Sequence, residues 1–219
     1  MLPFDEISED IVWRNEQLLI AKTLPYIHSF SDSHKEFLIK YSIPTIYAVW
    51  EGFVQNSFQI YVRELNKLEL QKNDFCLNIL THSIDSTFPQ LKEYPTEFDG
   101  RAKFISKLDK YFQDEFRISS IINTQSNVEL EMINKILHRF NLKPIPAYPY
   151  KQQLRDLLKF RNRISHGDNS LVISSDNIDD FKTRIDGFIT LVEQLMQEVF
   201  NRISDGYNID HSHLKQTLN

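Results

Sequence analysis

The residues best suited to chemistry lie in one stretch, from Lys151 to Asp168. On a helical wheel of about 100° per residue, one face of this stretch carries the apolar residues Leu154, Leu157, Leu158 and Ile164. Arg161 falls in the middle of that face. A guanidinium keeps its proton and is costly to bury alone. The position of Arg161 therefore implies a carboxylate partner, a phosphate ligand or a dimer cleft that stays wet.

A row of basic residues runs beside Arg161 at intervals of four: Lys151, Arg155, Lys159 and Arg163. We call this row the basic ridge. Asn162 lies between the ridge and Arg161, and His166 stands at the end of the same stretch. Fixed positive charge can hold a phosphodiester, and histidine can transfer protons near neutral pH. Arg161, Asn162 and His166 are therefore candidate catalytic residues, and the basic ridge is a candidate substrate-binding surface.

Three simpler interpretations stay open. A row of Lys and Arg is often only a solvated helix face. His166 directly precedes Gly167, so it can serve as a helix C-cap. Arg161 can belong to a structural ion pair inside a helical bundle. The interpretations differ in what they predict, because a structural Arg161 affects stability whereas a catalytic His166 affects activity in a folded protein.

Several helices must position these residues. Apolar residues spaced by three and four predict helices over residues 8–24, 33–41, 44–68, 75–83, 100–112, 128–140, 150–166 and 177–203. The first is expected to stop at Pro25, and Pro44 to interrupt or restart the chain. Capping boxes at Ser33 and Ser126 mark two helix starts, and Gly167 has the place of a left-handed C-cap. We therefore predict an all-α bundle with long core helices and no significant sheet.

The composition agrees with this architecture. The chain has 219 residues, 41% of them hydrophobic and only 5 of them glycine, so it can bury a core and lacks a glycine-rich phosphate loop. We expect one domain over residues 1–206 and a polar tail over residues 207–219. A single cysteine, Cys76, excludes an internal disulfide and cysteine-bound zinc. His211 and His213 lie in the tail without acidic ligands in a fixed element, so we predict no metal and no cofactor.

The formal net charge of −5 means that the whole chain does not attract nucleic acid, so any site for a polyanion must be local. The N-terminus lacks a basic region followed by an apolar segment, and no run approaches about 18 apolar residues. We therefore expect a soluble cytoplasmic protein that does not contact a membrane.

Two motifs resemble those of a known family. The run Arg161-Asn-Arg-Ile-Ser-His166 matches the Arg-x4-6-His motif of the HEPN superfamily, in which a polar residue often follows the Arg. The run Tyr47-Ala-Val-Trp50-Glu51-Gly-Phe resembles the Tyr-x-x-Trp-Glu-Gly-Phe signature of one branch of HEPN-like nucleases. The resemblance extends in helix order from residue 14 to residue 203, although residues 73–123 carry no motif that matches.

This resemblance implies a helical bundle that forms a homodimer, with the Arg-x4-6-His motifs of both copies around a shared cleft. It implies a metal-independent endoribonuclease that cleaves RNA by attack of the 2′-OH, acting as a toxin or effector in toxin–antitoxin or antiphage defence. A cognate antitoxin or a defence-system protein is then a possible partner. Arg161 and His166 correspond to the family's catalytic residues and Asn162 to its supporting polar residue. Our hypothesis adds Glu51 as the partner of Arg161.

Two further function classes stay open. One is a non-catalytic HEPN module that binds nucleotide, RNA or a partner protein. The other is a purely structural helical dimer, in which Arg161 forms an ion pair and His166 caps its helix.

Overall fold

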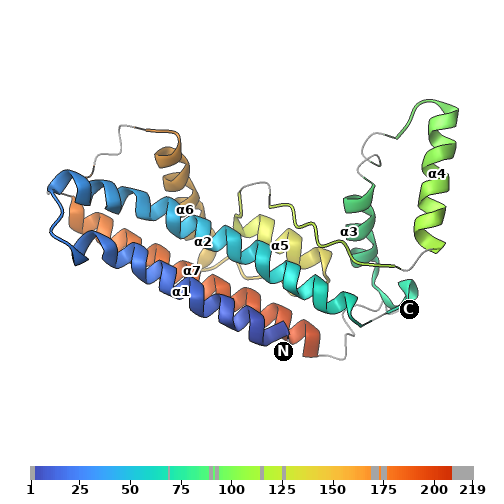
Figure 1. Cartoon of the computed structure of the whole chain (residues 1–219), viewed down its shortest axis with the longest axis horizontal. Coiled ribbons are helices and arrows are strands. Elements are labelled where there is room, and N and C mark those ends of the chain that lie inside the picture. Colours follow the sequence, from blue (N-terminus) through green and yellow to red (C-terminus); the bar gives the residue numbers. More distant parts are fainter. Residues whose placement is uncertain are drawn as a thin grey trace. The chain divides into compact units, whose positions relative to one another are not determined.

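The computed structural model describes residues 3–68, 70–88, 91, 94–113, 116–124, 127–168, 173 and 177–208. These residues form seven α-helices and one short 3₁₀-helix, with no strand among them (Figure 1). The helices are α1 (Pro3–Ile27), α2 (Asp32–Asn66), α3 (Leu77–Thr87), α4 (Phe98–Gln113), α5 (Leu130–Arg139), α6 (Tyr150–Ser165) and α7 (Ile178–Asn208). The 3₁₀-helix η1 spans Lys72–Asp74. The predicted all-α class is confirmed.

The chain divides into two compact units, which we describe separately. Unit 1 comprises Met1–Ser57, Thr124–Asn134 and Ile145–Asn201, and unit 2 comprises Phe58–Asn123, Lys135–Pro144 and Arg202–Asn219. Both motifs singled out in the sequence belong to unit 1. A single domain over residues 1–206 stays a prediction. Most of the predicted tail, residues 209–219 with His211 and His213, lies outside the described residues.

Unit 1 is built from four long helical segments. The α1 helix contacts α2 where the Arg14 Nη1 donates to the carbonyl oxygen of Val49 at 2.9 Å, and it contacts α7 where Phe4 and Phe200 meet edge to face. The α6 helix packs on α7 through Phe160 and Phe188, whose ring centroids lie 6.1 Å apart. Since α6 also contacts α2, as described below, these helices enclose the core of unit 1.

Unit 2 packs around aromatic rings. Phe140 stacks on Phe58 at 5.5 Å and meets the edge of Tyr61 at 5.8 Å. The His82 ring lies 4.9 Å from the same phenylalanine, and its Nε2 is 2.9 Å from the carbonyl oxygen of Ser119. These contacts hold α3 and the extended segment near residue 119 against the last turns of α2.

Two prolines do not stop their helices, which corrects our prediction. Helix α1 continues through Pro25 to Ile27, and α2 runs through Pro44 without interruption. A proline inside a helix removes one backbone hydrogen bond, at a cost of about 3 kcal/mol. Pro25 lies in the last turn of α1, and Ile43 and Ile46 are both fully buried beside Pro44. Burial of this face therefore outweighs the cost at Pro44.

Other predicted ends differ less. Helix α2 begins at Asp32, so the capping box predicted at Ser33 is wrong. The residue before the helix, Ser31, contacts its first turn, with its hydroxyl 2.9 Å from Nδ1 of His34. Ser126, the other predicted cap, lies outside the described residues. Helices α3 and α4 were placed within four residues of their ends by the apolar pattern alone.

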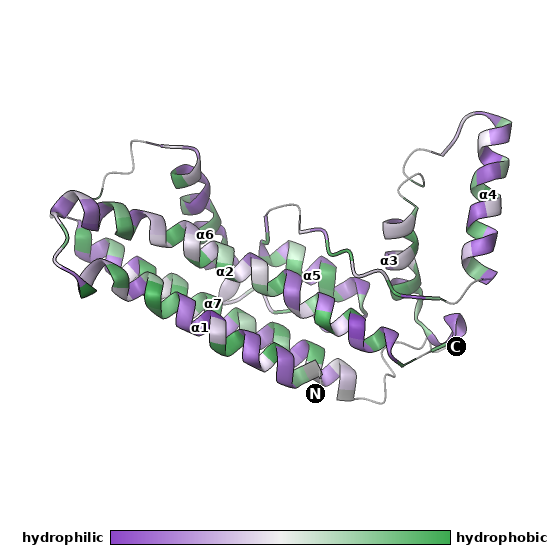
Figure 2. Cartoon of the chain, viewed as in Figure 1, coloured by the Kyte–Doolittle hydropathy of each residue, from purple (hydrophilic) through white to green (hydrophobic). Residues whose placement is uncertain are grey.

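Several large apolar residues of α1 are exposed, and Figure 2 shows hydrophobic residues along the length of this helix. It exposes Val12, Trp13, Leu19, Ile20, Leu24 and Ile27, each with at least 36% of its surface accessible. We call this set the α1 stripe. Apolar surface of this extent is uncommon on a monomer and is typical of an interaction surface. Within the described part of the chain, no helix combines the length and the apolar character needed to cross a membrane.

Candidate functional site

The end of α6 positions the candidate catalytic residues. Leu154, Leu157, Leu158 and Ile164 are buried, as the helical wheel predicts. Gly167 has a φ of 71°. Its N–H donates to the carbonyl oxygen of Ile164 at 3.1 Å, and the N–H of Asp168 donates to the carbonyl oxygen of Arg163 at 2.9 Å. This pair of bonds is a Schellman motif, in which His166 is the C-cap and the left-handed position favours glycine. The left-handed conformation predicted for Gly167 at the end of this helix is confirmed.

Arg161 is half-buried and is held from two sides. Its Cζ lies 4.7 Å from the centroid of the Tyr47 ring, and its Nη1 donates to Oδ1 of Asn162 at 2.7 Å. Among the described residues no carboxylate forms an ion pair with this guanidinium. An aromatic face attracts a cation without cancelling its charge. Arg161 therefore presents an oriented positive charge that an anionic ligand can use.

The ring beneath Arg161 is fixed by its own contacts. Tyr47 is almost fully buried, and its hydroxyl accepts the N–H of Val128 at 2.8 Å. Trp50, one turn further along α2, donates its indole N–H to the carbonyl oxygen of Val128 at 2.9 Å. Burial raises the pKa of Tyr47, so the ring stays a neutral phenol at physiological pH. Tyr47 belongs to the motif noted in the sequence, but no local pattern indicates that its ring lies under Arg161.

Glu51 does not pair with Arg161, contrary to our hypothesis. Its Oε1 accepts the hydroxyl of Thr124 at 3.1 Å, and that hydroxyl accepts the side-chain amide of Gln55 at 3.0 Å. Glu51 therefore ties α2 to the segment that also carries Val128. Tyr47, Trp50 and Glu51 thus act together: the first two bind Val128, Glu51 binds Thr124, and these bonds support the platform for Arg161.

The glycine of the same motif makes room for a buried arginine. A Cβ added at Gly52 would lie 3.0 Å from Nη1 of Arg14. Arg14 is only 8% exposed, its Nε donates to Asp10 at 2.7 Å, and its Cζ lies 5.9 Å from the Phe53 ring centroid. No local sequence pattern indicates a role for Arg14. The burial of Arg14 explains why a glycine, which weakens helices, stands at position 52 inside α2.

The basic ridge is partly neutralised. Lys151 and Arg155 both reach the same carboxylate oxygen of Glu131, at 2.8 and 3.9 Å, and the hydrogen bond from Lys151 lowers the pKa of Glu131. Arg163 pairs with Asp168 at 2.7 Å across the C-cap turn. Lys159 is exposed and forms no ion pair with any described residue. The ridge therefore offers less free positive charge than four basic residues suggest.

His166 is exposed, and its ring makes no hydrogen bond or ion pair with the part of the chain described here. Five residues along a helix correspond to a rotation of about 140°, so His166 faces solvent while Arg161 faces Tyr47. One copy of the chain therefore displays the two candidate catalytic residues on different sides of α6. A site that uses both needs a further surface, such as a second copy, to bring the matching groups together.

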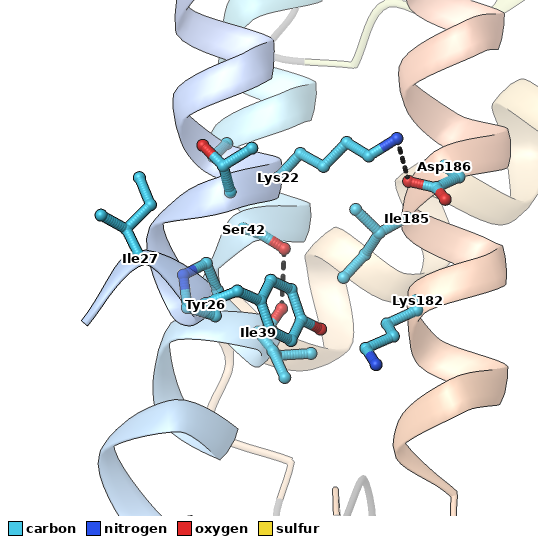
Figure 3. A pocket seen from close by; sticks show the side chains of 11 residues that line it. Lys22, Tyr26, Ile27, Ile39, Ser42, Lys182, Ile185 and Asp186 are labelled. Carbon is cyan, nitrogen blue, oxygen red and sulfur yellow. Dashed lines mark hydrogen bonds and ion pairs between the residues drawn. The ribbon is translucent and has the colours of Figure 1, made fainter. Parts of the chain in front are cut away.

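A separate hollow of about 320 Å³ lies between α1, α2 and α7 (Figure 3). Its walls are mainly apolar, with Ile39 and Ile185 among them, and Tyr26 stands at its edge. At its rim Lys22 pairs with Asp186 at 3.0 Å. No candidate site residue lines this hollow. Lys182, the second lysine of the hollow, pairs with Asp179 at 3.1 Å. Because both lysines are already paired, the hollow offers less to a phosphate than Arg161 does.

The candidate site holds groups suited to anions rather than to metal ions. Arg161, Asn162, His166 and Lys159 supply cations and hydrogen-bond donors. Within the described ranges, no three side chains of His, Cys, Asp or Glu gather where they could bind a metal ion. Such a set can hold a phosphodiester, stabilise added negative charge on it and move a proton.

Comparison with known proteins identifies one family. The model of the HEPN_MAE_28990-like HEPN family matches residues 4–210, nearly the whole chain. Searches of curated proteins and of solved structures gave no match.

Proposed function

Because this chain belongs to the HEPN_MAE_28990-like HEPN family, we propose that it is a metal-independent endoribonuclease whose active site forms between two copies. The observation that carries the proposal is the state of Arg161. Its guanidinium is stacked on Tyr47, oriented by Asn162 and not neutralised by any described carboxylate. A purely structural arginine inside a bundle would be expected to pair with one.

The chemistry follows from these groups. The ribose 2′-oxygen attacks the adjacent phosphorus, a base removes the 2′-proton, and an acid gives a proton to the leaving 5′-oxygen. The products are a 2′,3′-cyclic phosphate and a 5′-hydroxyl. His166 of each copy serves one proton transfer, and Arg161 stabilises the negative charge that grows on the phosphorane. Because DNA lacks the 2′-OH, the reaction is specific for RNA.

A homodimer completes the site. Each chain supplies one His166, on the opposite side of α6 from Tyr47, so a two-fold axis near this helix end supplies the second histidine that acid–base chemistry needs. Asn162 keeps Arg161 in place, and Lys159 adds a free positive charge for the RNA backbone. We further propose that the enzyme works in the cytoplasm as a toxin or effector of bacterial defence, held in check by a cognate antitoxin or partner protein.

A second candidate is a non-catalytic HEPN module that binds RNA or a partner protein. The neutralised ridge favours it, because Glu131 and Asp168 occupy three of the four ridge cations. Such a module would bind without cleaving, and it would keep its function when His166 is replaced.

Cleavage in excess EDTA separates the two candidates. Wild type, Arg161→Ala, His166→Ala and the control His28→Ala, an exposed histidine of unit 1, are incubated with total RNA, and the fragment ends are mapped. We expect wild type and His28→Ala to give fragments with 2′,3′-cyclic phosphate ends, and the other two variants to give none. Intact RNA with folded wild type would refute the nuclease. Equal cleavage by His166→Ala would refute the role of that histidine.

A further inference from the structure

Helix α4 is packed into unit 2 through one side only. Phe104 is buried there, with ring centroids 6.0 Å from Phe88 and 5.7 Å from Tyr94. Tyr111 packs on the same side, 5.2 Å from Phe88 and 6.0 Å from Phe116. At the end of the helix, Phe112 is half-buried and its ring centroid lies 4.5 Å from Nζ of Lys72. These contacts fix the helix and leave a broad face of it exposed.

The first part of this solvent-facing surface is aromatic and apolar. Phe98 is 80% exposed, Ile105 52% and Tyr94 50%. The Cζ of Arg101 lies 5.6 Å from the Tyr94 ring centroid, and its Nε donates to the carbonyl oxygen of Pro95 at 2.9 Å. The structure thus displays an exposed phenylalanine beside an ordered tyrosine–guanidinium stack. Flat exposed groups of this kind are typical of surfaces on which other rings stack.

The second part of the surface is a row of lysines. Lys103, Lys107 and Lys110 are exposed, and none forms an ion pair with a described residue. On the helical wheel the small exposed residues Ala102 and Ser106 lie between this row and the aromatic edge. Figure 2 shows hydrophilic and hydrophobic residues side by side along α4. The helix therefore carries an aromatic edge, a shelf of small side chains and a row of free positive charge.

We propose that this face of α4 binds single-stranded RNA. Unpaired bases of the strand stack on Phe98 and on the Tyr94–Arg101 pair. The strand lies across the shelf, so that its phosphates face the lysine row. The helix is 16 residues long, about 24 Å, which suits a site of about four nucleotides. Double-stranded RNA does not fit, because its bases are not free to stack. The inference rests on the proposed function for RNA as the substrate and adds that the substrate is unpaired.

The charge pattern favours RNA over a protein partner. Lysine is depleted at protein–protein interfaces, whereas lysine rows interleaved with aromatic residues are typical of single-strand binding. Two exposed acidic residues lie near the shelf. Asp109 already accepts a hydrogen bond from Gln113 at 2.7 Å, and Asp99, in the first turn of α4, stands four residues before Lys103, so two of the three lysines have no carboxylate one turn before them. A protein that bound the apolar edge would bring its own surface close to the three lysines. It would have to supply carboxylates for them or leave them unpaired.

Binding can be measured without cleavage. The full chain carrying His166→Ala is titrated into a fluorescein-labelled oligouridylate of about twelve nucleotides, within the site sizes of single-strand binders, and anisotropy is recorded. We expect Phe98→Ala to weaken binding about tenfold through the loss of one stacked base. We expect Lys103→Gln, Lys107→Gln and Lys110→Gln together to reduce the slope of log K against log salt by about 2. The matched control is Phe37→Ala, which removes an aromatic side chain of α2 that is 57% exposed. It should change neither the affinity for the oligouridylate nor the salt slope.

The outcomes separate this inference from the proposed function. Unchanged binding by folded Phe98→Ala overturns the α4 site, even if wild type cleaves RNA. Weaker binding by Phe98→Ala supports the α4 site, even if wild type cleaves nothing and the nuclease proposal falls. If Phe98→Ala changes the molecular mass of the protein in light scattering but leaves its RNA affinity unchanged, this face of α4 contacts another protein chain. That result would overturn the inference. Equal affinity for a duplex of the same length would overturn the preference for unpaired bases.

Discussion

The planar shape of Arg161 matters as much as its charge. The guanidinium lies over the Tyr47 ring while Nη1 donates to Asn162. A ring face and an amide oxygen hold the group before any ligand binds, and its other N–H groups remain as donors for a phosphate. This preorganisation is what makes a positive charge effective in a transition state. A lysine at the same place would have charge without a plane to stack.

Arg161→Lys tests this directly. We expect cleavage to fall by about a hundredfold with little change in thermal stability, because the ammonium keeps the charge but loses the stack and the fork of donors. The matched control is Arg184→Lys, since Arg184 stacks on Phe160 in the same way, with Cζ 4.5 Å from the ring centroid, outside the candidate site. The measurement is the initial rate of RNA cleavage. Equal rates for Arg161→Lys and wild type would show that charge alone suffices.

At the scale of the element, the Tyr47-to-Phe53 motif of α2 works in two directions. In one direction, Tyr47 and Trp50 bind Val128 and Glu51 binds Thr124. In the other, Gly52 and Phe53 contact Arg14 of α1. One stretch of two helical turns therefore joins three parts of unit 1. The motif supports the candidate site without itself supplying a group that would touch the RNA.

Gly52→Ala should destabilise the protein. The added methyl group would lie 3.0 Å from Nη1 of Arg14, which cannot move without losing its bond to Val49. A buried hydrogen bond of a charged group contributes about 1.5–3 kcal/mol, which exceeds the gain of about 1 kcal/mol in helix propensity. We expect the melting temperature to fall by a few degrees. Gly187→Ala, with no atom within 4 Å of the new methyl, is the control and should raise it slightly. A rise at both positions would show that Arg14 adapts.

Stability should also depend on pH through His82 in unit 2. Burial lowers the pKa of His82, so the folded state holds it neutral, while the unfolded chain binds a proton at about 6.5. Its contribution is therefore complete above pH 6.5 and is lost as pH falls from there toward the folded-state pKa. The slope is at most about 1.4 kcal/mol per pH unit. Urea unfolding of wild type between pH 5 and 8 should show this loss.

The control for this titration is His82→Gln. Its amide can still donate to the carbonyl of Ser119, which His82 Nε2 approaches at 2.9 Å, but it does not titrate. We expect its stability to be lower at pH 8 and to depend less on pH than that of wild type. Parallel pH profiles for the two proteins would place the pH dependence in another group.

At the scale of the whole molecule, the proposed site depends on where two copies meet. Arg161 and His166 face different sides of α6, so the composite site needs the dimer contact near this helix end. The α1 stripe is a competing apolar surface. Within unit 1, α1 packs on α2 and α7, and the stripe faces away from the core. A dimer that forms at the end of α6 should tolerate substitutions in the α1 stripe, whereas a dimer that forms through the α1 stripe should dissociate when the stripe is changed.

Mixing wild type with His166→Ala distinguishes a shared site from two independent ones. If one cleft needs both histidines, only dimers of two wild-type chains cleave RNA. After subunit exchange, activity should then follow the square of the wild-type fraction, about one quarter at an equal mixture. A linear decline would indicate that each chain carries its own site.

A substitution in the α1 stripe completes this test. Leu19→Glu, at a side chain 59% exposed, should leave both the dimer and its cleavage intact when measured by light scattering and RNA digestion. If Leu19→Glu instead gives an inactive monomer, the α1 stripe is the dimer contact and the composite site at α6 is refuted.

Local pattern alone determined a large part of this protein. The three- and four-residue spacing located the long helices, placed Arg161 within an apolar face of α6 and, with Gly167, located the end of that helix. These features depend on neighbours within about one turn, which a sequence states directly. Local rules were wrong at Pro25, through which α1 continues to Ile27, and at Pro44, where burial of Ile43 and Ile46 outweighed the loss of a backbone bond.

Tertiary structure decided which groups meet. It gave Arg161 the Tyr47 ring rather than Glu51, joined Glu51 to Thr124, and set Glu131 against two cations of the basic ridge. Periodicity places a side chain on a face of its own helix, but its partner depends on the distance and rotation of another helix, which packing over the whole unit sets. The sequence by itself therefore determined which residues could do chemistry, and the fold decided that Arg161 would keep its charge available.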